Sequence, residues 1–186
     1  MKIIPPGVFV ALLALLVLTG SAIGQPAAIS WPEAAARLAG ERAKAETCVA
    51  LMKKYGDDAQ VARAQLTYTD AKADFDGVIA GLITALSTGR APESVESLQG
   101  KLGNGVSKLV DLCKMASDLV PNTSGQKTIL LNIAVIAVAP LLKMLSDAVS
   151  TLYSNYRTDD ALTRKTIQTQ LEAARWPAFS EVKAAQ

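Results

Sequence analysis

The sequence contains no histidine and only two cysteines among its 186 residues. Without imidazole, the Ser-His and Cys-His nucleophilic pairs, imidazole metal sites and histidine-ligated haem are all excluded. Two cysteines are also too few for thiolate zinc sites or iron–sulfur clusters. We therefore expect a protein that is not an enzyme of these classes and that holds no metal and no cofactor.

Aromatic residues are scarce at 5%, and neither sign of charge dominates, since 19 Lys and Arg stand against 17 Asp and Glu. A nucleic-acid-binding protein normally carries a basic stripe with aromatic side chains beside it. The two signs are spread along this chain instead. We expect no nucleic-acid partner.

The amino-terminal segment has the three parts of an export signal. Lys2 supplies a positive charge, Val8 to Leu18 is an unbroken apolar run, and Ala22-Ile23-Gly24 places small residues at the peptidase site. We predict cleavage before Gln25, so that residues 1–24 are a signal peptide and residues 25–186 form a single α-helical domain. A retained membrane anchor is the alternative, but the run is shorter than the roughly 20 residues that span a bilayer. The expected location is therefore periplasmic or secreted.

Residues 25–186 contain the sequence signals that start and end helices. Ser30-Trp31-Pro32-Glu33 is a capping box with proline at the first helical position, and Gly56 is expected to end this first helix with a left-handed cap. A second helix is predicted over residues 58–88, with Asp57 and Gln60 as its capping residues and Gly89 as its stop. Apolar residues recur in both at a spacing of three and four; in the second helix they are Val61, Ala64, Tyr68, Ala71, Phe75, Val78, Leu82 and Ala85.

A third helical pattern follows Pro92 and extends to Val120, but three glycines between residues 100 and 105 predict a break in it. A fourth helix is predicted over residues 126–156 and a fifth over residues 159–175, the fifth with an apolar face of Leu162, Ile167, Leu171 and Ala174. The tail from Ala178 is expected to fray. The predicted fold class is all-α: a single helical bundle of four long helices plus a shorter C-terminal helix.

The stretch 129–142 within the fourth predicted helix is apolar on nearly every face. Such a helix is either the buried centre of a bundle or a membrane segment. The uncharged part covers roughly 22 Å as a helix, which is short of a hydrocarbon core of about 30 Å. We favour the buried centre, and insertion of this helix into a bilayer remains an alternative.

Cys48 and Cys113 are predicted to form a disulfide. Exported proteins mature in oxidising compartments, where an even number of cysteines tends to pair. Each cysteine precedes the end of its helix by eight residues, at Gly56 and Pro121. If the helices alternate in direction, both cysteines lie about 12 Å below the same end of the bundle. The alternative is two buried, unpaired thiols.

Two patterns could suggest catalysis or metal binding. Ser124 and Lys127 have the S-x-x-K spacing of serine β-lactamases, but no K-T-G follows, and Ser124 is explained as the N-cap of a helix. Asp70 and Asp74 stand one helical turn apart, with Asp76 near them. We interpret these carboxylates as a solvated helix face and expect no catalytic residues.

The large aromatic residues near predicted helix ends are Trp31, Trp176, Tyr153 and Tyr156. They are interpreted as plugs of the bundle ends, or alternatively as a rim for a partner or membrane interface. The expected function is a non-enzymatic helical binding module with a protein partner. Membrane insertion of residues 129–142 and carriage of an apolar ligand are the two alternatives.

Overall fold

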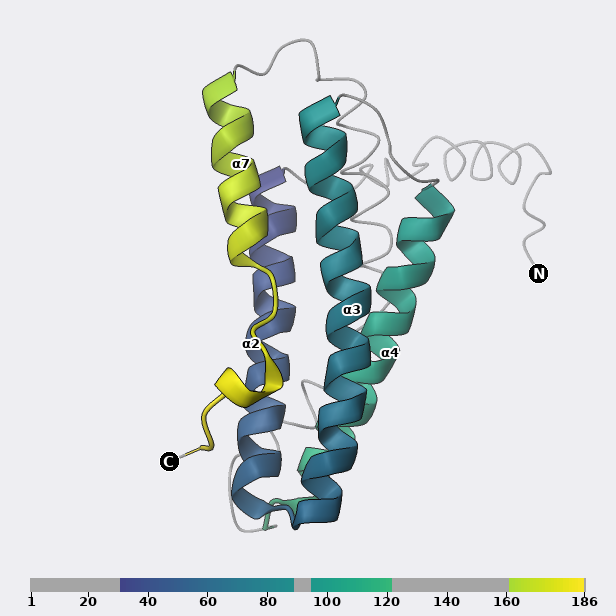
Figure 1. Ribbon diagram of the computed structural model, residues 1–186, viewed down its shortest axis with the longest axis vertical. Helices are drawn as coiled ribbons and strands as arrows, with labels where there is room; N and C mark the ends of the chain where they lie inside the picture. The colour runs from purple at the N-terminus through teal and green to yellow at the C-terminus, as the bar shows by residue number, and fades with distance from the viewer. Residues whose placement is uncertain (1–30, 89–94, 122–160, 186) are drawn as a thin grey trace, which may run out of the picture.

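The computed structural model describes residues 31–88, 95–121 and 161–185, and this part of the chain is helical, without a strand (Figure 1). The helices are α2 (Trp31–Tyr55), α3 (Asp58–Thr88), α4 (Val95–Leu119), α7 (Ala161–Ala173) and the short 3-10 helix η1 (Phe179–Glu181). The all-helical prediction is confirmed for these residues. The predicted signal peptide and the apolar helix over residues 126–156 lie outside them, as do Ser124, Tyr153 and Tyr156.

The turn between α2 and α3 is a tight helical hairpin. The Gly56 N–H donates to the Met52 carbonyl at 2.8 Å, and Asp57 and Gln60 each accept the other's backbone N–H at 2.8 and 2.9 Å. This reciprocal pair is a capping box, as the sequence predicts for Asp57 and Gln60. The expectation of a left-handed Gly56 is wrong: glycine is needed because a Cβ there would lie 2.7 Å from the Met52 oxygen.

Helix α3 runs antiparallel to α2, α4 and α7, and it packs against each of them (Figure 1). Helix α4 also packs along α2, so that α2, α3 and α4 enclose one apolar core. The apolar stripes predicted at three-and-four spacing point into this core. Its largest fully buried side chains are Tyr68, Phe75, Leu38, Met52, Ile79, Leu82, Leu102, Leu109 and Leu112.

Helix α4 is continuous through Gly100, Gly103 and Gly105, so the predicted break is wrong. Gly105 is buried against α3, where a Cβ would approach the Phe75 ring to 3.0 Å and the Asp74 Cβ to 3.2 Å. The close approach of two helices offsets the unfavourable helix propensity of this glycine. A Cβ at Gly100 or Gly103 would meet nothing within 4 Å. At these two positions the neighbouring turns of α4 keep the backbone helical.

The carboxyl-terminal segment is ordered against α2 and α3, contrary to the expected frayed tail. Figure 1 shows residues 174–185 descending from α7 across α2. Val182 is buried, and the Ala185 N–H donates to the Ala50 carbonyl at 3.0 Å. One expected core contact is also wrong, because Leu162 on α7 is 73% exposed, whereas Ile167 and Leu171 are buried.

Candidate functional site

Cys48 on α2 and Cys113 on α4 are joined by a disulfide, with their Cα atoms 5.1 Å apart. Both side chains are fully buried. The bond closes a loop of 65 residues and fixes α2 directly beside α4. The predicted disulfide is therefore present, and the two cysteines lie at the same depth, as the sequence analysis expects. No thiol is free in the described chain.

The carboxylates of α3 are not one solvated face, which corrects the sequence-based interpretation. Asp74 accepts a hydrogen bond from Lys108 Nζ of α4 at 2.8 Å. Asp76 forms an ion pair with Lys72 and also accepts the Trp176 backbone N–H at 3.3 Å. Of Asp70, Asp74 and Asp76, only Asp70 is exposed. Asp74 and Asp76 therefore connect α3 to α4 and to the carboxyl-terminal segment.

Glu41 is the single polar residue in the apolar stripe of α2, and it is 4% exposed. Lys44 Nζ donates to its Oε1 at 2.8 Å, while Oε2 is buried without a hydrogen-bond partner among the described residues. A buried charge that is only half satisfied is costly. We therefore expect Glu41 to make the core less stable than an apolar side chain of similar size would.

Trp176 packs against the side of the bundle, so its predicted place as an end plug or rim is wrong. It is 3% exposed, its ring stacks on Phe75 with centroids 4.7 Å apart, and Tyr68 lies 5.2 Å away. Tyr68 donates its hydroxyl to the Pro177 carbonyl at 2.9 Å. Burial away from water raises the pKa of Tyr68, with the charge of Glu46 adding to the effect. Trp31 is also buried, at 6% exposed.

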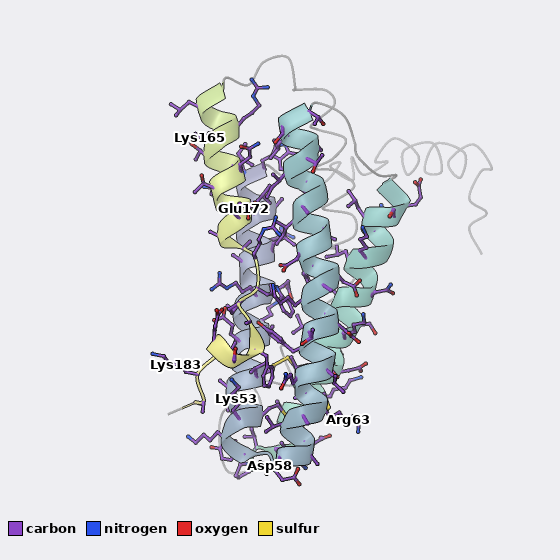
Figure 2. All side chains as sticks on the ribbon, in the orientation of Figure 1. Lys53, Asp58, Arg63, Lys165, Glu172 and Lys183 are labelled. Atoms are coloured by element: carbon purple, nitrogen blue, oxygen red, sulfur yellow. A yellow bond between two sulfur atoms is a disulfide. The ribbon has the colours of Figure 1, made fainter. Side chains whose placement is uncertain are left out.

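Lys53 of α2 forms hydrogen bonds with the carboxyl-terminal segment. Its Nζ donates to the carbonyls of Phe179 and Val182, both at 2.6 Å, and lies 4.6 Å from the centroid of the Phe179 ring. Figure 2 shows Lys53 beside the carboxyl-terminal segment that ends near Lys183. Lys53 therefore attaches the carboxyl-terminal segment to α2.

On the side away from the carboxyl-terminal segment (Figure 2), the surface of α3 and α4 contains a groove. This groove of about 520 Å³ runs between α3 and α4, and we call it the α3–α4 groove; it is lined by Arg63, Leu66, Thr67, Asp70, Lys108, Asp111, Lys114, Met115 and Asp118. Leu66 is 71% exposed at its edge. The sequence offered a signal that was missed: Leu66 lies off the apolar stripe of α3, between Ala64 and Tyr68, and so cannot point into the same core.

The charges in the α3–α4 groove fall into two groups. Lys108 is held by Asp74, and Lys114 lies 3.9 Å from Asp111. Arg63, Asp70 and Asp118, by contrast, make no ion pair or hydrogen bond through their side chains within the described chain. Figure 2 shows Arg63 on the side of the bundle away from the carboxyl-terminal segment. An exposed leucine flanked by an unpaired cation and an unpaired anion is a surface suited to binding.

None of the helices in residues 31–88, 95–121 and 161–185 is long and apolar enough to cross a membrane. The same residues contain no group of three or more acidic or cysteine side chains placed to hold a metal ion. The sequence matches no known family model, and no curated protein or solved structure is detectably similar to it. The function must therefore be inferred from the described surface.

Proposed function

We propose that this protein is an exported, non-enzymatic binding module that contacts a protein partner through the α3–α4 groove. In this proposal residues 1–24 are removed, and residues 25–186 form one domain of four long helices plus a shorter C-terminal helix. The observation that carries the proposal is Leu66, a large apolar side chain that is 71% exposed at the edge of a groove with charges of both signs. Protein interfaces combine such an apolar anchor with a polar rim.

The disulfide supports the exported location. Structural disulfides persist in the periplasm and outside the cell and are rare in the cytosol of mesophiles. The contacts of the carboxylates support the non-enzymatic role, because Asp74 and Asp76 are occupied by bonds between elements of the fold. The remaining groups of the groove are suited to recognition rather than to proton transfer.

Site-specific photo-cross-linking in the producing cells tests the proposed surface. A photoreactive residue at position 66 should give a discrete protein adduct in the exported fraction, and Arg63→Glu in the same chain should abolish it. The matched control carries the photoreactive residue at position 162, since Leu162 is equally exposed, at 73%, but lies on α7. The same adduct from both positions, or no adduct from position 66, would refute the binding role of the groove.

A further inference from the structure

The exposed surface of α3 has a charge pattern that is complementary to itself. Arg63, Leu66, Thr67 and Asp70, which we call the α3 stripe, all line the α3–α4 groove and recur at three-and-four spacing. They therefore lie along one side of the helix, with Arg63 and Asp70 about 10 Å apart, or two turns. The stripe thus runs from a cation through a small apolar centre to an anion.

A helix with this order fits a second copy that runs in the opposite direction. When two such helices cross about a twofold axis placed between Leu66 and Thr67, Arg63 of each copy faces Asp70 of the other. The two Leu66 side chains then lie on either side of the axis, where each packs against the Thr67 methyl group of the other copy. An isologous contact of this kind uses one surface twice and closes after two chains.

We propose that the partner at the α3–α4 groove is a second copy of this chain, docked antiparallel along the α3 stripe. This inference rests on the proposed binding function and names its partner. The groups that it uses are free for the purpose: Leu66 is 71% exposed, and within the described residues neither Arg63 nor Asp70 has an ion-pair partner. Of the other charged side chains of the groove, Lys108 pairs with Asp74 and Lys114 with Asp111 within one chain, whereas Asp118 of α4 has no such partner among the described residues.

The twofold arrangement predicts a result that binding of a different protein would not produce. Arg63→Asp places two carboxylates opposite each other at both ends of the stripe, and Asp70→Arg places two guanidinium groups there. Each variant alone should weaken self-association at least about tenfold, because two attractive pairs become two repulsive ones. In a mixture of the two variants, the acidic stripe of one chain faces the basic stripe of the other. Both pairs are then attractive again, so the mixture should associate as a heterodimer.

The experiment measures the molar mass of the disulfide-bonded mature chain by sedimentation equilibrium over a range of concentrations. The unmodified chain should form a reversible dimer, each single variant should remain a monomer at the same concentrations, and the equimolar mixture should regain the dimer. Leu66→Glu should also abolish the dimer, whereas Leu162→Glu on α7 should not. Circular dichroism of each variant checks that its helices are intact, as expected for exposed positions.

A monomer at all concentrations up to about 1 mM would overturn the inference. So would a dimer that survives both single charge reversals, or a mixture of the two variants that stays monomeric. The proposed function fails separately: if the purified chain is monomeric but position 66 still cross-links in cells in an Arg63-dependent manner, the groove binds a different protein and only the second-copy assignment is wrong.

Discussion

The ring of Trp176 stacks on Phe75 with the centroids 4.7 Å apart and the planes inclined by 23°. This contact joins the chain beyond α7 to the middle of α3, and the backbone N–H of Trp176 adds a bond to Asp76. Aromatic pairs contribute about 0.5–1.5 kcal/mol beyond the area that they bury. The carboxyl-terminal segment is thus part of the core rather than an appendage.

Replacing Trp176 tests that conclusion. Trp176→Ala should lower the free energy of unfolding by about 3–5 kcal/mol, as expected for a buried tryptophan. Trp176→Phe should cost much less, since it keeps an aromatic ring on Phe75 and removes an indole N–H that is buried without a partner in the described chain. Urea denaturation of both variants provides the measurement. Equal losses would show that the indole nitrogen, and not the stacked ring, holds the segment in place.

The helix ends could be predicted from the sequence because they depend on local signals, and the disulfide because two cysteines in an exported chain tend to pair. Capping residues such as Asp57 and Gln60, and the position of each cysteine relative to its helix end, are read along one stretch of chain. The docking of Trp176 and the burial of Val182 could not be predicted in this way. They depend on where residues 174–185 meet α2 and α3, and no periodicity within so short a segment encodes that contact.

The glycines of α4 show the same difference between local and tertiary information. Gly105→Ala should lower the free energy of unfolding by about 1–3 kcal/mol, because its Cβ would press on Phe75 at 3.0 Å. Gly100→Ala is the matched control: nothing lies within 4 Å of its Cβ position, so it should raise the free energy of unfolding by about 0.5–1 kcal/mol. Denaturation curves that rank the two variants in the reverse order would contradict the close packing of α3 and α4.

The buried Glu41 predicts an unusual pair of stability changes. Glu41→Met should be neutral or should raise the free energy of unfolding by about 1 kcal/mol, since an apolar side chain of similar length replaces a half-satisfied carboxylate. Lys44→Met should lower it by about 1 kcal/mol, because the buried carboxylate loses the ammonium group that is 2.8 Å away. Chemical denaturation of the two variants checks this. A large loss for Glu41→Met would indicate that Oε2 has a partner that stabilises it.

Tyr68 predicts how stability changes at alkaline pH. Burial raises the pKa of Tyr68 in the folded protein above its ordinary value of 10.0. Above pH 10.0 the Tyr68 hydroxyl loses its proton in the unfolded chain but keeps it in the folded protein. The free energy of unfolding should therefore fall as the pH rises. Tyr68→Phe should cost about 1 kcal/mol at neutral pH, through the lost hydrogen bond to Pro177, and should decline less steeply above pH 10.0. Parallel slopes for the two proteins would show that Tyr68 ionises freely in the fold.

The proposal of an exported, disulfide-braced module is tested most directly by the intact mass of the protein recovered from the exported fraction without reduction. We predict a chain that begins at Gln25 and is lighter by two hydrogen atoms than the reduced form, because Cys48 and Cys113 are bonded. Treatment with a thiol-alkylating reagent under denaturing conditions should leave this mass unchanged. A mass that retains residues 1–24, or that increases by two alkyl groups, would contradict the proposal.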